Sequence, residues 1–447
     1  MTAIVERTVA PVADNRLHSQ SIRRLKTFIW LYLLLLLFEG AVRKWIPPLS
    51  TPFLLVRDPV ALLIWFSGRR LRVGSQRVWT AFDIYALTIT ILGLLQLIGT
   101  TLNPLVILYG WRSYVLHIPV IIVLGAFLDA KDLKTIGKWT LIISIPMTIL
   151  MVAQYLAPPV SFLNRGASEG GGQIIGALGH IRPAGTFSYI TGPISFVPLV
   201  AVTCIWGMVR KGLFPQWLVY SSAIATLIVI PVSVSRSIAV LVAGVIFTSA
   251  LGIVIRSGIS FNPDRLPHIA VGMLAGVAVV IGLAQVPLVR DAMDTFTTRW
   301  TQAQGTAGDN SALEDRIVAS VTEALSPVTK VSALGSGIGA GSSVAAALNN
   351  NRLSSFEFGE GSLEREVYEL GSWLGPIFVL SRMVFALVLF VSLFRSIYRG
   401  VILPWLLVVP ALGAITQGSF DLATSQGFLV VIVGITIASL RMEQDAR

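Results

Sequence analysis

Long apolar stretches recur along the chain and are separated by short polar connections. A membrane-crossing helix needs about 20 mostly apolar residues, and about twelve stretches approach that length and composition. They lie at residues 28–46, 53–67, 81–99, 113–128, 139–156, 188–209, 217–232, 238–255, 269–286, 372–394, 401–416 and 424–440. The pattern predicts an all-α fold, a polytopic integral membrane helical bundle with about 12 transmembrane helices.

Basic residues are dense in every second connection between these stretches. Two such connections hold the residues Arg69, Arg70, Arg72 and Arg77, and Lys131, Lys134 and Lys138. Cytoplasmic loops of membrane proteins carry an excess of Lys and Arg. We therefore expect these connections, the N-terminal tail 1–27 and the C-terminal tail 441–447 to be cytoplasmic. The N-terminal tail lacks the small-residue cleavage site of a signal peptide, so we expect the first span to be retained.

Composition narrows the class of protein further. Of the 447 residues, 54% are hydrophobic and only 13% are charged, whereas soluble domains carry about 25% charged residues. This excludes an ordinary cytosolic enzyme and a disordered chain. A net charge of +11 might suggest nucleic acid in a soluble protein, but in a membrane protein the first question is which side of the bilayer each charge occupies, and no nucleic-acid partner is expected. The single cysteine, Cys204, excludes an intramolecular disulfide and a cysteine-based zinc site.

Two connections on the outer side are long. One, 157–187, lies within the first block of helices at 28–286, and the other, 287–371, precedes the last three helices at 372–440. A loop of the second size is usually functional or a small subdomain. We expect it to be partly helical, because Ser311 and Glu314 have the spacing of a capping box. A further helix is predicted to begin near Ser362 and to continue into the tenth span.

Several arginines lie in the outer segments or at outer span ends. Arg182 precedes the sixth span, Arg236 lies in a tight connection between two spans, and Arg316 lies in the large loop. Arginine at this depth is expensive unless it is paired or hydrated, and it is functional by default, although snorkelling to lipid phosphates is the alternative for residues such as Arg43. Guanidinium groups match phosphate bidentately and keep their charge. Converging arginines here predict a site for a lipid-linked diphosphate.

An acidic run, 355–371, ends the large loop. It holds Glu357, Glu360, Glu364, Glu366 and Glu369. A carboxylate held near a hydroxyl can act as a general base, and the alternative is a solvated helix face with partners such as Arg365 for Glu369. His180 is the only histidine in an outer loop, and Arg112 lies at an outer span end. No HExxH motif and no P-loop lysine accompany these residues, so no metal and no nucleotide cofactor is predicted.

Four local motifs, in their order and placement, resemble the O-antigen ligase and O-antigen polymerase superfamily. RPAGTFS at 182–188 looks like the family's Arg-x-x-Gly-x-Phe element, and VSRS at 234–237 looks like its Ser-Arg element. Arg316, followed by GSGIGAG at 335–341, resembles the large-loop pattern, and ELGSWLG at 369–375 resembles the Glu-x-Gly-x-x-Gly that opens the tenth span. The stretch FEGAVRKWIPP also looks like members that act on exopolysaccharides.

The resemblance implies metal-independent, inverting glycosyl transfer at the periplasmic face of the bacterial inner membrane, without a cofactor. A glycan on undecaprenyl diphosphate is the donor, a second glycan is the acceptor, and other polysaccharide assembly or export proteins are further partners. The resemblance implies that Arg182, Arg236 and Arg316 bind the diphosphate. It leaves His180, Arg112 and Glu369 as candidate substrate-binding residues.

The large loop departs from the family in having no histidine. Family ligases typically carry one before the Glu-x-Gly-x-x-Gly element, and here the acidic run takes its place. Glu360 and Glu364 are therefore the candidate catalytic bases, and a polymerase is favoured. Two alternatives stay open: a ligase that transfers the glycan to a lipid or a protein, and a secondary transporter or polysaccharide exporter. Charged residues near the midpoints of the spans would favour a transporter or exporter. Most of the predicted spans lack such charges, and Arg382 in the tenth span is the exception.

Overall fold

A computed structural model describes the protein over residues 12–167, 172–259, 282, 285–306, 325–348, 362–399 and 401–445. The regular secondary structure of these residues is helical. Extended backbone pairs only at two isolated bridges, Arg165–Gly172 and Ile175–Ile181. The described part therefore confirms the all-helical class.

Nine helical stretches among the described residues are long and apolar enough to cross a membrane, which supports a multi-pass helical membrane protein. Two shorter apolar helices, α9 (Gln216–Val232) and α17 (Val408–Gln417), accompany them. The long helices are α1 (Val12–Trp45), α4 (Gln76–Gly99), α7 (Ala130–Leu156), α8 (Thr191–Val209), α10 (Arg236–Ile259), α15 (Ser362–Tyr398) and α18 (Ala423–Asp445). The predicted span 269–286 falls almost wholly outside the described residues.

Three of the predicted spans are interrupted rather than continuous. The second begins as a 3₁₀ turn and is built from α2 (Ser50–Leu54) and α3 (Arg57–Arg70). The fourth joins α5 (Pro104–Trp111) to α6 (Ile118–Phe127) through a π-helical turn, η2 (Arg112–Leu116). In the eleventh, α16 (Leu403–Leu406) precedes α17. Such breaks are tolerated because neighbouring groups satisfy the backbone that they release.

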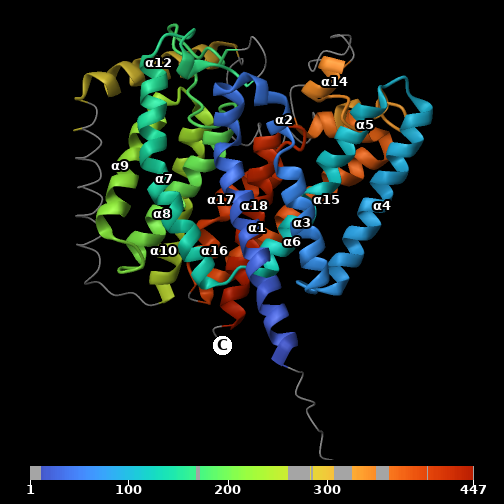
Figure 1. The fold of residues 1–447 in the computed structure, drawn as a ribbon. Coiled ribbons are helices and arrows are strands. Elements are labelled where there is room, and N and C mark those ends of the chain that lie inside the picture. Colours follow the sequence, from blue (N-terminus) through green and yellow to red (C-terminus); the bar gives the residue numbers. More distant parts are fainter. Residues whose placement is uncertain are drawn as a thin grey trace, which may run out of the picture.

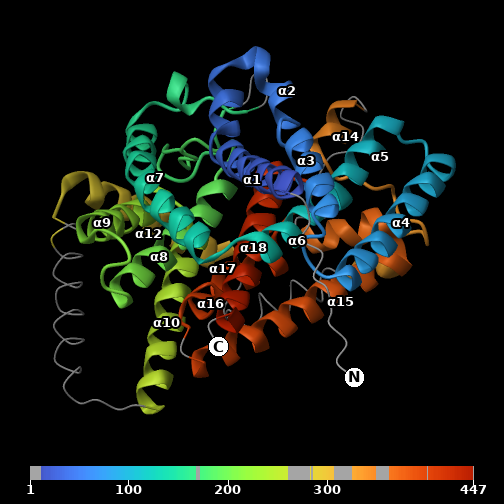
Figure 2. The same cartoon turned by 60° about the horizontal axis from the view of Figure 1, so that its bottom comes forward.

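Helix α18 forms the centre of the bundle (Figures 1 and 2), where α1, α6, α8, α16 and α17 pack around it. Glycines bring α6 and α18 close together. A Cβ on Gly434 would lie 2.6 Å from Leu124 Cβ, and one on Gly125 would lie 2.8 Å from Ile437 Cγ2. Small residues at helix interfaces allow this approach within membranes. The contact explains why an apolar C-terminal helix becomes the core of the fold.

The two ends of the bundle differ. The C-terminus and the first turns of α1 lie at one end (Figure 1), which we call the terminal end. At the opposite end, which we call the loop end, lie α2, α12 (Pro287–Thr306) and α14 (Ser343–Leu348). Helix α12 packs against α9. It turns Val289, Ala292 and Thr295 inward and leaves Arg290 and Met293 exposed, as expected for an amphipathic helix.

Candidate functional site

A short hairpin-like turn at the loop end carries two of the predicted site residues. The bridge between Ile175 and Ile181 closes it, with Gly176 N donating to His180 O at 2.7 Å and Arg182 N donating to Ile174 O at 2.8 Å. Gly179 has a φ of +79°, which a turn of this kind requires. Because side chains alternate along extended backbone, His180 and Arg182 share the face opposite the buried Ile181.

Arg182 reaches the junction between α9 and α10. Its Nη2 donates to Ser235 Oγ at 3.3 Å, and Ser235 directly precedes Arg236, the first residue of α10. Its Nε is buried without a hydrogen-bond partner in the described part of the chain. Burial, together with repulsion from Arg299 and Arg236, lowers the pKa of Arg182 to about 10. The side chain therefore stays cationic near neutral pH beside two other cations.

Helix α12 supplies the third guanidinium. Arg299 Nη1 donates to Gly176 O at 3.1 Å. The lack of a side chain at Gly176 allows the turn to approach the α9–α10 junction, because a Cβ there would lie 2.9 Å from Val234 Cγ1 and 3.3 Å from Arg182 Cγ. We call Arg182, Arg236 and Arg299 the arginine cluster. Arg299 and Arg236 both repel the charge of Arg182. An anion with several oxygens would relieve this repulsion by bonding to more than one guanidinium group.

The structure places Arg182 and Arg236, two of the predicted diphosphate ligands, close enough to repel each other, and adds Arg299, which sequence reasoning missed. Asp291, Thr295 and Arg299 are spaced at i, i+4 and i+8 and so lie on one face of α12. That spacing is ordinary on an amphipathic helix, so it did not single out Arg299 in the sequence. The predicted diphosphate ligand Arg316 and the predicted base Glu360 lie outside the described residues. The second predicted base, Glu364, is half-buried in the first turn of α15.

His180 lies between α7 and α12. Its ring stacks on the Tyr155 ring, with centroids 4.2 Å apart and planes 4° from parallel. Its Nδ1 is 3.2 Å from Tyr155 O, and its Nε2 is 3.6 Å from Asp291 Oδ2. The Tyr155 hydroxyl donates to the same Asp291 oxygen at 2.8 Å. His180 thus joins the turn to the face of α12 that also carries Arg299.

Glu369 fastens the glycine-rich segment 335–341 onto α15. The carboxylate is 2% exposed and accepts hydrogen bonds from Gly341 N at 2.9 Å and from the Tyr114 hydroxyl at 2.8 Å. The i,i+4 pair of Glu369 with Arg365, considered from the sequence, does not form. Arg365 Nη1 instead donates to Asp421 Oδ2 at 2.6 Å, because the α17–α18 connection comes over the first turn of α15.

Arg112 is held inside the bundle by an ion pair. Its Nε and Nη2 donate to the two carboxylate oxygens of Asp58 at 2.6 and 2.8 Å, and the side chain is 7% exposed. Asp58 is also 3.1 Å from His117 Nε2, and His117 Nδ1 is 3.0 Å from the Tyr32 hydroxyl. The neighbouring Arg57 does not pair with Asp58 but with Glu39.

Arg382, the charge within the tenth span, is neutralised as well. It pairs with Glu366, and it also donates to the carbonyl oxygens of Ile415 and Gly418 near the C-terminal end of α17, at 2.8 Å for Ile415 and 2.7 Å for Gly418. A buried charge with this many partners is satisfied where it stands. These contacts assign Arg382 a structural role in joining α15 to α17.

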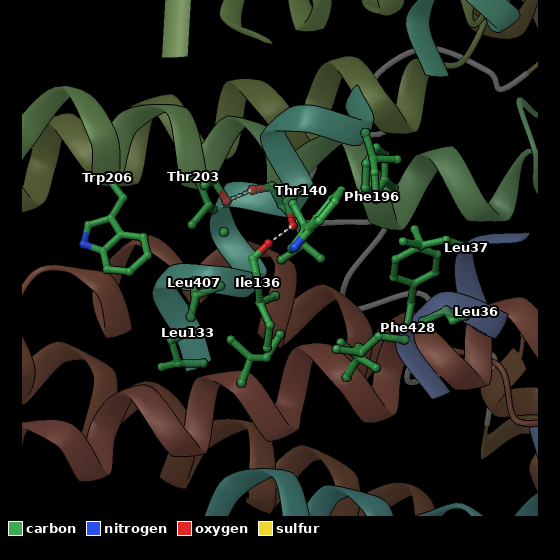
Figure 3. A pocket seen from close by; sticks show the side chains of 18 of the residues that line it. Leu36, Leu37, Leu133, Ile136, Thr140, Phe196, Thr203, Trp206, Leu407 and Phe428 are labelled. Carbon is green, nitrogen blue, oxygen red and sulfur yellow. Dashed lines mark hydrogen bonds between the residues drawn. The ribbon is translucent and has the colours of Figure 1, made fainter. Parts of the chain in front are cut away.

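An apolar pocket lies inside the bundle, between α1, α7, α8 and α18 (Figure 3). The threonine hydroxyls at its wall, Thr140 and Thr203, bond to carbonyls of their own helices, Ile136 O and Leu199 O. The pocket therefore offers few polar groups to a ligand and suits a hydrocarbon chain. Its end at Leu37 is next to the 182–188 segment, because the Thr186 hydroxyl donates to Leu37 O at 2.6 Å.

The described residues hold no group of three or more His, Cys, Asp or Glu side chains that could bind a metal ion. No family model matches the chain, and the search of curated proteins finds no relative.

Proposed function

We propose that this protein polymerises undecaprenyl-diphosphate-linked oligosaccharide repeat units by inverting, metal-independent glycosyl transfer. The observation that carries the proposal is the arginine cluster, three guanidinium groups from separate elements at the loop end. In this proposal the chain crosses the bacterial inner membrane about 12 times. Both termini are cytoplasmic, and the loop end faces the periplasm, where exopolysaccharide or O-antigen repeat units are joined.

The arginine cluster would bind the diphosphate of the donor and stabilise the negative charge that develops as it leaves. Fixed donors aimed at developing charge are commonly the largest catalytic contribution, and the loss of one costs about 10²- to 10³-fold in rate. Arg316 is proposed to join the cluster from the large loop. The hydroxyl of the acceptor glycan attacks the anomeric carbon, and Glu360 or Glu364 is the base that the sequence proposes for its proton.

Two further features support a lipid-linked donor. The apolar pocket between α1 and α7 adjoins the segment that carries Arg182 and has the lining that a polyprenyl chain prefers. Basic residues lie in the first turns of α1, such as Arg23, and in the first turns of α7, such as Lys134, and the ion pair between Lys26 and Asp132 joins these turns. This agrees with a cytoplasmic position for the terminal end. Both features fit a bilayer-embedded enzyme with its site on the outer face.

The test uses the purified protein and a synthetic undecaprenyl-diphosphate oligosaccharide, with no other enzyme. A ladder of lengthening glycans is expected on gel electrophoresis. Arg182→Ala, Arg236→Ala and Arg299→Ala should each slow it about 10²- to 10³-fold. Arg290→Ala is the matched control, since Arg290 is exposed on α12 and its Nη2 donates to Gln285 Oε1, away from the cluster. The proposal fails if the wild-type protein makes no polymer, or if the three variants match it in rate.

The ligase alternative uses the same cluster and differs in the acceptor. A single capped lipid or protein acceptor, in place of a ladder, would identify a ligase. The transporter or exporter alternative has less support, because the charge inside the tenth span, Arg382, is paired with Glu366 and with backbone carbonyls. Uptake of a labelled solute into vesicles, without covalent change, would favour that class instead.

A further inference from the structure

His180 is held in a single orientation next to the arginine cluster. The stacked Tyr155 ring fixes its plane, and Nδ1 lies 3.2 Å from the Tyr155 carbonyl oxygen. A carbonyl oxygen only accepts hydrogen bonds, so Nδ1 carries the proton of the neutral ring. The other nitrogen, Nε2, then has its lone pair free to accept a proton.

Asp291 is placed to stabilise the ring once it is protonated. Its Oδ2 is 3.6 Å from His180 Nε2, slightly longer than a hydrogen bond, and the Tyr155 hydroxyl holds that oxygen at 2.8 Å. A proton on Nε2 would convert this approach into a charged pair. The His180 side chain is 28% exposed and the Asp291 side chain 58%, so a sugar hydroxyl can reach them.

The same two elements carry the cations of the site. Arg182 is two residues after His180 on the same face of the turn, and Arg299 is two helical turns after Asp291 on the same face of α12. Arg299 also donates to Gly176 O, which belongs to the turn that ends at His180. In an inverting displacement the attacking hydroxyl approaches the anomeric carbon from the face opposite the diphosphate, so the base that the reaction needs lies across the sugar ring from the cations.

From this geometry we propose that His180 accepts the proton of the attacking acceptor hydroxyl, with Asp291 as a positioning residue. This inference rests on the proposed function and replaces Glu360 and Glu364 in that role. The acceptor oxygen forms a bond to the anomeric carbon while the bond from that carbon to the diphosphate oxygen breaks. The electron pair leaves with the diphosphate, which the arginine cluster holds. The hydroxyl proton moves to His180 Nε2 and from there to solvent.

Besides Asp291, other charged and titratable groups lie on the elements packed around the imidazole. They come from the turn, from α7, from the start of α10 and from α12, and they are Arg182, Tyr155, Arg236, Asp294 and Arg299. The assay therefore compares pH profiles of variants with that of the wild-type protein, and does not depend on an absolute midpoint.

Initial polymerisation rates are measured on the purified full chain across about pH 5 to 8, where histidine side chains change charge. The wild-type rate should fall as the pH is lowered. His180→Gln should reduce the rate about 10²- to 10⁴-fold and flatten the acid limb. Asp291→Asn should cause a smaller loss and move the limb to lower pH, because it removes the negative charge facing the protonated ring.

Chemical rescue separates a lost base from a lost fold. Added imidazole should restore part of the activity of His180→Gly and none of the activity of Arg182→Ala. The inference is overturned if His180→Gln keeps the wild-type acid limb, if imidazole does not rescue His180→Gly, or if Glu364→Gln or Glu360→Gln abolishes the limb. In those cases a polymerising wild-type protein still upholds the proposed function, whereas an inactive wild-type protein overturns both.

Discussion

Arg112 offers the sharpest test of whether a predicted substrate-binding residue is instead part of the scaffold. The substitution Arg112→Met removes two hydrogen bonds, at 2.6 and 2.8 Å, from the carboxylate of Asp58. Hydrogen bonds to charged groups contribute about 1.5–3 kcal/mol each, and removing one partner of a buried pair costs about 3–5 kcal/mol. We expect Arg112→Met to lower the free energy of unfolding by about 3–5 kcal/mol.

The double variant Arg112→Met/Asp58→Asn should recover most of that loss. It leaves no uncompensated charge, and the asparagine oxygen can still accept from His117 Nε2, which lies 3.1 Å from Asp58 Oδ1. The free energies are measured by unfolding titrations in mixed micelles, with all four members of the mutant cycle. We expect a coupling energy of about 2 kcal/mol or more.

Polymerisation assays on the same variants complete the test. If Arg112 only supports the bundle, the double variant should fold and retain activity close to that of the wild-type protein. A double variant that is as stable as the wild type yet inactive would show that Arg112 contacts the substrate. A coupling energy near zero would refute the structural role of the pair.

Two other predictions concern the cluster and the core. Because Arg182, with a pKa of about 10, stays charged near neutral pH, the cluster should bind inorganic pyrophosphate there, and the affinity measured by calorimetry at one fixed neutral pH should fall in Arg299→Gln; a wild-type affinity in that variant would contradict the cluster. Gly434→Leu should destabilise the bundle by at least about 1–3 kcal/mol, since the new Cβ would lie 2.6 Å from Leu124 Cβ, whereas Gly413→Ala, with its nearest atom at 3.6 Å, should change the melting temperature little.

The positions of several helices follow from the apolar pattern alone. The predicted stretch 188–209 is helical from Thr191 to Val209, and the predicted stretch 238–255 lies within α10. These agreements have a local cause, because the length and composition of one segment decide whether it can cross a bilayer. The π-helical turn at Arg112–Leu116 was not predicted from the apolar pattern, and neither was the bond of its first residue to Asp58 from another helix.

The residues of the candidate site also fall into those that the sequence could identify and those that it could not. Arg182 and Arg236 could be singled out because arginine next to an apolar span is costly wherever it occurs. Arg299 could not, because α12 is amphipathic and an arginine on such a helix is ordinary until the helix is seen against the turn that carries Gly176. Glu369 was a candidate substrate-binding residue in the acidic run, and its bonds to Gly341 N and the Tyr114 hydroxyl appear only once the glycine-rich segment is folded against α15.

The sequence by itself determined that this is a helical membrane protein and which of its segments are apolar enough to cross, because the transfer of side chains into lipid is a sum over neighbouring residues. Only the tertiary structure decided the fate of each charge. Arg112, Arg57 and Arg382 meet carboxylates from other helices, whereas Arg182 meets two further guanidinium groups. The Coulomb energy of a side chain depends on groups that are far away in sequence and near in space, so no reading of the local pattern could tell these arginines apart.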